Sequence, residues 1–154
     1  MKKLKTACLS KVLLIIIILG LVMMTALLIT LPWSMKWIFE GTTFYQQVEH
    51  SKILILLYIT GIPAWIILWM TKNLAINIIK RDPFSDRSVT SLRAISLCAL
   101  FIFFCYLFTC VFVKMTLGML VITAGAFLVA LIAALLYRLV ELAILIKEEN
   151  DLTI

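Results

Sequence analysis

The sequence has few charged residues and little of the polar surface that a soluble domain needs. Only 14% of its 154 residues are charged, whereas 64% are hydrophobic. A soluble domain is nearer about one quarter charged and one half apolar. Lipid is therefore expected to solvate much of the outside of this protein. With five glycines and three prolines, the chain also has no flexible linker or low-complexity stretch, so we expect a single domain over residues 1–154.

Residues that bind metals or catalyse reactions are also scarce. The chain has one histidine and four cysteines, and no two cysteines have CxxC spacing or a histidine nearby, which argues against a zinc site. His50 stands beside Glu49, but two ligands do not define a metal site. The sequence shows neither paired carboxylates nor a nucleophile with a base. We therefore expect no catalytic residue, no metal, no cofactor and no enzymatic activity.

Four apolar runs are long enough to cross a membrane, which takes about 20 residues in a helix. They predict an all-α, polytopic four-transmembrane-helix bundle with spans at approximately 12–32, 53–71, 94–113 and 117–141. The first run begins like a signal peptide, but its apolar stretch is too long and no small-residue cleavage site follows, so we expect a retained span. Gly61 and Pro63 predict a kink in the second. The fourth stays apolar to Ile146, so its last turns should emerge from the membrane.

The net charge of +6 comes from basic residues that flank the apolar runs. Eleven of the 14 lysines and arginines fall on the side of the two termini, and three fall on the other side. Because cytoplasmic segments carry the excess of basic residues, this bias predicts that both termini are cytoplasmic. The chain has no basic helix or aromatic sheet motif, so we expect no direct binding of nucleic acid.

The two connections on the predicted outer side differ in length. Residues 114–116 alone join the third and fourth spans, which predicts a tight antiparallel hairpin. The segment from Trp33 to Lys52 joins the first two spans and contains Trp33, Trp37 and Tyr45. Aromatic residues collect at membrane interfaces, so the segment is either an interfacial lid or an outward-facing site for an apolar ligand or peptide.

The inner connection between the second and third spans predicts a sharp turn. Pro83 disfavours helix at Asp82, the residue before it. Ser85 can then cap a new helix, with Asp86 in its first turn complementing the helix dipole. We expect two cytoplasmic helix extensions joined by this turn, the second of them running into the third span.

The long fourth apolar run carries two features on its faces. Arg138 and Glu141 have i,i+3 spacing, which places them on neighbouring positions and predicts a structural ion pair at the membrane interface. Ala126, Ala130 and Ala134 form a stripe of small residues that allows close helix packing. The stripe serves either the bundle itself or a homodimer.

Several stretches of the chain resemble a known bacterial family. The Pro83-Phe84-Ser85 turn, the Leu92-Arg93 entry into the third span and the ending from Glu149 to Ile154 are similar to the YoaS-like membrane proteins, called domain of unknown function 2975. The resemblance covers essentially the whole chain and implies a multi-pass protein of the bacterial cytoplasmic (inner) membrane. Members are commonly encoded beside a small Cro-like helix-turn-helix regulator, which implies a regulatory role and that partner.

A docking surface for such a regulator is expected at the cytoplasmic elements, because loops on a rigid scaffold commonly carry function. The candidate partner-binding residues are Pro83, Phe84, Ser85, Arg87, Glu149, Asn150, Asp151 and Leu152. The alternative is a small transport protein or a bacteriocin or toxin immunity protein that acts through the outer aromatic segment.

Overall fold

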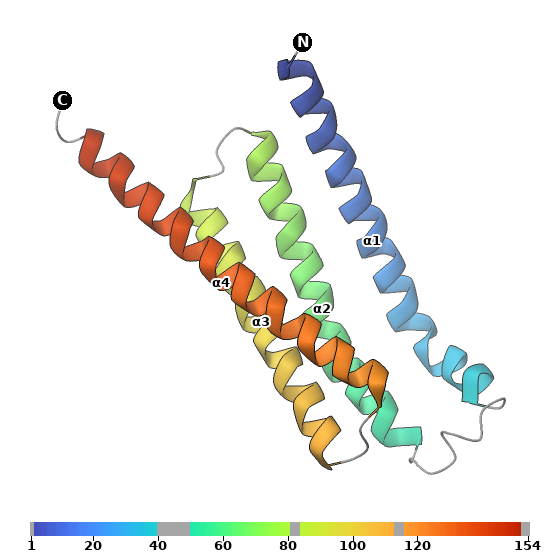
Figure 1. Cartoon of the computed structure of the whole chain (residues 1–154). Coiled ribbons are helices and arrows are strands. Elements are labelled where there is room, and N and C mark those ends of the chain that lie inside the picture. Colours follow the sequence, from blue (N-terminus) through green and yellow to red (C-terminus); the bar gives the residue numbers. More distant parts are fainter. Residues whose placement is uncertain (1, 40–49, 81–83, 113–115, 152–154) are drawn as a thin grey trace.

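The computed structural model describes the backbone of residues 2–39, 50–80, 84–112 and 116–151, and the side chains of residues 10–34, 51–80, 84–112 and 116–150. The described residues form four helices and no strand (Figure 1): α1 (Lys2–Phe39), α2 (His50–Ile79), α3 (Asp86–Phe112) and α4 (Leu117–Asp151). The prediction of an all-α chain is confirmed.

Each helix contains a stretch long and apolar enough to cross a membrane. These stretches are Ser10–Ser34, Ser51–Ile79, Asp86–Phe112 and Leu117–Asn150. Inside hydrocarbon every backbone N–H and C=O must bond within the protein, which a helix achieves without a partner strand. Accordingly α1, α2 and α4 cover their predicted spans and extend beyond them, and α3 begins before its predicted span and is described to Phe112.

The beginning of α1 and the end of α4 lie at the same end of the molecule as the end of α2 and the beginning of α3 (Figure 1). This end is called the terminal end below. The end of α1, the beginning of α2, the end of α3 and the beginning of α4 lie at the opposite end. An even number of antiparallel helices produces this arrangement.

Helix packing follows the order of the chain. Among the residues that the structure describes, extensive contacts join α3 to α4, α2 to α3 and α1 to α2 only. The α1 helix (blue in Figure 1) accordingly lies at one side of the molecule, and α4 crosses α3. The helices are held together pairwise, with α2 and α3 at the centre.

The buried core lies along one stripe of α3 and is built largely from small residues. Its members on α3 are Ser88, Ser91, Leu92, Ile95, Ala99, Ile102 and Thr109. On α4, Ala130 and Ala133 are buried, and the Ser96 hydroxyl donates to the Ala130 carbonyl oxygen over 3.0 Å. Small residues let two backbones approach closely where lipid competes for apolar surface. The predicted alanine stripe thus contributes, through Ala130, to packing within the chain.

The α1 helix continues to Phe39 through Pro32, past the predicted end of the first span at residue 32. A proline removes the bond to the carbonyl four residues earlier, here that of Leu28. The Tyr58 hydroxyl of α2 donates to this same oxygen over 3.2 Å. A hydrogen bond from the neighbouring helix therefore replaces the one that Pro32 cannot make, which explains why α1 does not stop there.

Two further contacts hold α1 against α2. The Trp65 indole N–H donates to the Thr25 hydroxyl over 3.1 Å. A Cβ added at Gly61 would lie 2.6 Å from the Leu28 Cδ2, so only glycine fits this approach without a shift of Leu28. The α2 helix runs unbroken through Gly61 and Pro63, and the kink expected there stays a prediction.

Candidate functional site

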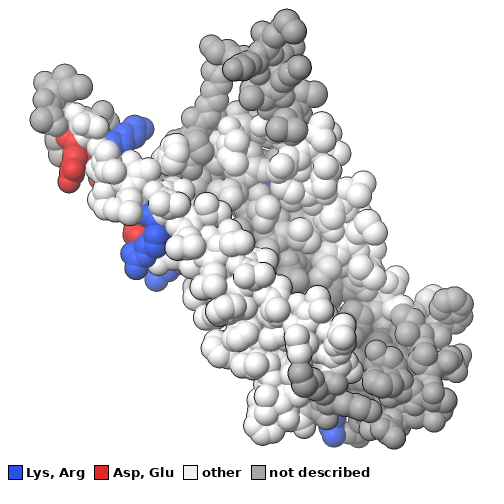
Figure 2. Space-filling model, viewed as in Figure 1, with Lys and Arg blue, Asp and Glu red and all other residues white. Residues whose placement is uncertain are grey.

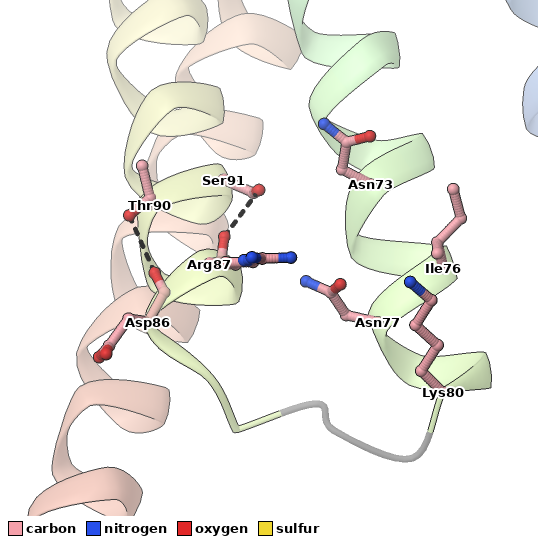
Figure 3. A pocket seen from close by; sticks show the side chains of 8 residues that line it. All are labelled: Asn73, Ile76, Asn77, Lys80, Asp86, Arg87, Thr90 and Ser91. Carbon is pink, nitrogen blue, oxygen red and sulfur yellow. Dashed lines mark hydrogen bonds between the residues drawn. The ribbon is translucent and has the colours of Figure 1, made fainter.

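A polar cavity of about 520 Å³ lies between α2 and α3 at the terminal end of the molecule (Figure 3). Small-molecule sites typically enclose about 300–1,000 Å³, so the cavity has room for a ligand. The residues that line it are Asn73, Ile76, Asn77, Lys80, Asp86, Arg87, Thr90 and Ser91.

Helical spacing places these residues on two facing surfaces. Asn73 is followed at three and four residues by Ile76 and Asn77, and these by Lys80, so the four share one face of the last two turns of α2 and the residue directly after it. The other four residues come from the first two turns of α3. The turn that joins the helices brings these two polar faces together.

A small hydrogen-bonded network forms beside the cavity and fixes the two helices to each other. The Asn77 side-chain amide donates to the Ser88 hydroxyl over 3.2 Å, and the Ser88 hydroxyl lies 3.3 Å from that of Ser85. Ser88 is completely buried. Because Ser88 is shielded from water, its hydrogen bond holds the Asn77 amide in a fixed orientation.

Ser85 also marks the beginning of α3, as the sequence predicts. Its carbonyl oxygen accepts the backbone N–H groups of Ser88 and Val89, at 2.8 and 3.2 Å. The helix begins at the next residue, Asp86, whose carboxylate stands in the first turn. A negative charge there complements the helix dipole.

Two cations point into the space between the helices. In Figure 3 the Arg87 side chain extends from α3 toward α2, and the Lys80 ammonium group turns back toward Asn77. Asp86 points away from the space in the same view. The Thr90 and Ser91 hydroxyls donate to the carbonyl oxygens of Asp86 and Arg87, each over 2.9 Å. These two hydroxyl protons are therefore used within α3, and the charged donors that face the cavity are those of Lys80 and Arg87, which suit an anionic ligand.

The structure places the candidate partner-binding residues in two separate regions. Phe84 is 53% exposed and Arg87 lines the cavity, so the turn presents both an apolar and a basic group. Glu149 and Asn150 are exposed near the end of α4, which points away from the α2–α3 connection in Figure 1. Asp151 belongs to α4, but its side chain, Pro83 and Leu152 lie outside the described residues.

Of the residues that line the cavity, only Arg87 was named from the sequence as a candidate site residue, and the polar residues missed on the α2 side are Asn73, Asn77 and Lys80. Their spacing of four and three residues at the end of the second span was the available signal. Hydropathy does not show which face of α2 meets α3, so the signal did not identify them as part of a site.

The outer aromatic residues are only partly described. Trp33 lies on α1 at the opposite end of the molecule and is 82% exposed. Trp37 is also helical, but its side chain and the whole of Tyr45 lie outside the described residues. The structure therefore shows Trp33 on the extension of α1, and whether the three form one surface stays a prediction.

A second, apolar cavity of about 270 Å³ receives residues from all four helices. Thr60 and Tyr106 bring the hydroxyl groups among its lining side chains. The full set is Met24, Leu27, Leu28, Leu31, Leu57, Thr60, Gly61, Ala64, Ile102, Tyr106 and Ile122. This lining suits an apolar ligand.

The expected ion pair on α4 is present. Arg138 donates to the Glu141 carboxylate over 3.1 Å, with the two side chains 68% and 44% exposed. Figure 2 shows charged side chains gathered toward the C-terminal part of α4, next to a broad face of uncharged residues. The pair is exposed on the surface of the described chain, and its position at the membrane interface stays a prediction.

Among the residues that the structure describes, no three His, Cys, Asp or Glu side chains are grouped as metal ligands. Cys98, Cys105 and Cys110 are free thiols on α3. The polar cavity and the apolar cavity described above are therefore the candidate sites in the described part of the chain.

Comparison with known proteins gives two matches. The family described as "Protein of unknown function (DUF2975)" matches residues 2–154. The chain is 33% identical to the "Uncharacterized membrane protein YoaS" of Bacillus subtilis (strain 168), over 71% of this chain and 76% of the relative. No solved structure matches the chain.

Proposed function

The chain belongs to the DUF2975 family of proteins, and from that premise we propose that it is a non-enzymatic membrane regulatory protein that binds a small helix-turn-helix transcription regulator at its cytoplasmic face. The observation that carries the proposal is the length of α4, which takes a charged helix end beyond the membrane. The family resemblance supplies the kind of partner.

The length argument rests on helix geometry. The 35 residues of α4 span about 52 Å at 1.5 Å per residue. The hydrocarbon core is only about 30 Å thick, so several turns must lie outside it. Its last described residues, Lys147, Glu148, Glu149 and Asn150, are all exposed. A rigid, charged helix end at the membrane surface is a suitable docking element for a soluble partner.

The turn between α2 and α3 provides a second element at the same terminal end. Phe84 is an exposed aromatic residue beside the basic cavity. Exposed aromatic groups next to charged ones are common anchors in protein interfaces. A regulator held between this turn and the end of α4 would be kept away from DNA, and a change in helix packing would alter that hold.

The direct test is copurification. The full-length protein, solubilised in detergent from its own host, is purified by affinity and the retained proteins are identified by mass spectrometry. We expect a small helix-turn-helix protein, and we expect its recovery to fall at least tenfold when Phe84→Ser is combined with removal of residues 151–154. A tenfold loss corresponds to about 1.4 kcal/mol, which is typical of one interface anchor.

Leu117→Ser is the matched control, since Leu117 is an apolar residue, 84% exposed, at the opposite end. It should leave recovery of the regulator unchanged. Equal recovery of the regulator with the wild type and with the combined variant would contradict the proposed docking surface. Recovery of the membrane protein without any partner would contradict it as well.

A small transport or immunity protein is the second candidate, and the apolar cavity is the observation that favours it. Such a protein would bind a lipid, a drug or part of a bacteriocin among the residues contributed by the four helices. Thr60→Leu would fill the cavity, and this candidate predicts altered toxin or drug tolerance with no change in transcription. The regulatory proposal predicts no change in tolerance.

A further inference from the structure

We propose that the polar cavity between α2 and α3 binds a phosphate ester with a net negative charge, such as the phosphate in the headgroup of an anionic lipid. The inference rests on the geometry of the cavity and does not depend on the regulatory role. The chemistry is that of a phosphate ester, and the experiment below distinguishes a lipid from a soluble source.

The first argument is the convergence of two different cations from two helices. Lys80 comes from the end of α2 and Arg87 from the beginning of α3, and both side chains point into the space between the helices (Figure 3). Arginine binds phosphate oxygens through a planar fork, and lysine adds a compact point charge. Asp86 also lines the cavity, but its carboxylate points away from the two cations.

The second argument is that the surrounding donors are held in place. Asn77 is fixed by its bond to the fully buried Ser88 hydroxyl. The cavity also lies at the N-terminus of α3, a helix of 27 residues, whose dipole favours an anion there. An anion between Lys80 and Arg87 would therefore meet oriented amide and helix dipoles in addition to the two charges.

The third argument concerns depth in the membrane. The apolar part of α2 ends with Ile78 and Ile79, both exposed, and Lys80 follows directly. Since the apolar stretch of α2 runs to Ile79, past the span end predicted at residue 71, the change to a basic residue at Lys80 fits the level at which hydrocarbon gives way to headgroups. Basic pockets between transmembrane helices at that level bind anionic headgroups in other proteins. A lipid phosphate would reach the cavity without leaving the bilayer.

The test is native mass spectrometry of the full-length protein from detergent micelles that contain phosphatidylglycerol, with phosphatidylcholine as the zwitterionic comparison. We expect the wild type to retain phosphatidylglycerol preferentially. The double variant Lys80→Gln with Arg87→Gln should lower that retention about 25-fold, since each of the two basic residues near the surface contributes a factor of about five.

Arg93→Gln is the matched control, because Arg93 is an exposed arginine of the same helix that does not line the cavity. It should leave retention within twofold of the wild type. A loss of about fivefold, the factor expected for any one basic residue near the surface, would show general charge attraction and would overturn the site. Unchanged retention in the double variant would overturn it as well.

Two further measurements complete the test. Thermal unfolding followed by tryptophan fluorescence checks that the double variant is folded. The variant Arg87→Lys keeps the charge but lacks the planar guanidinium group, so it should give an intermediate loss of phosphatidylglycerol retention. Glycerol 3-phosphate is added as a soluble competitor. Displacement of the lipid at millimolar concentration assigns the site to phosphate esters in solution, whereas no displacement assigns it to the lipid.

Discussion

The Tyr58 hydroxyl on α2 donates a hydrogen bond to the carbonyl oxygen of Leu28 on α1, over 3.2 Å. This oxygen is the one that Pro32 deprives of its helical donor. The side chain of Leu28 meanwhile lies against Gly61. One residue of α1 thus takes part in both a polar and a steric contact with α2, and the attachment of α1 depends on it.

Replacing Tyr58 with phenylalanine should destabilise the protein by about 1 kcal/mol, because the Leu28 carbonyl is then left without a donor. In a Pro32→Ala background the backbone N–H at position 32 can bond to that carbonyl, so the same replacement should cost much less. Thermal unfolding of the four proteins of this double-mutant cycle measures the difference. Equal costs in the two backgrounds would contradict the role assigned to Tyr58.

A methyl group at Gly61 should separate α1 from α2 slightly. The added Cβ would lie 2.6 Å from the end of the Leu28 side chain, so Gly61→Ala is expected to cost about 1 kcal/mol, at the low end for overpacking. Leu28→Ala should relieve much of that cost when the two are combined. Gly20→Ala is the control, because no atom lies within 4 Å of its added Cβ.

Ser88 should tolerate neither a larger nor a non-polar side chain. It is completely buried and receives the Asn77 amide, so Ser88→Ala should cost about 1 kcal/mol by leaving that donor unpaired. Ser88→Val adds volume in a filled position and should cost about 1–3 kcal/mol more. Thr90→Val, whose hydroxyl bonds only to a carbonyl of its own helix among the described contacts, is the control and should be near neutral in the same unfolding measurement.

The Arg138–Glu141 pair is expected to contribute little to stability. Both side chains are well exposed, and exposed i,i+3 pairs contribute roughly 0.2–0.5 kcal/mol. Glu141→Gln should therefore change the free energy of unfolding by less than about 0.5 kcal/mol. A loss above about 2 kcal/mol would indicate that membrane desolvates the pair.

The distribution of basic residues predicts the orientation in the membrane. In a protein whose native cysteines are replaced by alanine, Phe84→Cys should be protected from an impermeant maleimide in intact cells and should react after the cells are broken. Leu117→Cys, at the opposite end, should react in intact cells. The reverse pattern would place the termini outside and would contradict the charge rule for this chain.

The four helices and the beginning of α3 were predictable because they depend on local properties. Apolar run length predicts a spanning helix, and Pro83 followed by Ser85 predicts a turn and a cap. The passage of α1 through Pro32 was not predictable, because it depends on Tyr58 in another helix. The placement of Lys80 and Arg87 on opposite sides of one cavity likewise depends on which faces of α2 and α3 meet.

The pairwise packing along the chain has a consequence for assembly in the cell. Extensive contacts among the described residues join only consecutive helices, so each helix meets its main partner as soon as the next one leaves the ribosome. Such low contact order favours rapid folding, because few long chain segments must close into loops. The first helix, α1, has no companion until α2 has been synthesised. Until then the Thr25 hydroxyl and the Leu28 carbonyl, which lacks a helical donor, face lipid or the insertion machinery. When α2 is in place, Trp65 donates to Thr25 and Tyr58 donates to Leu28.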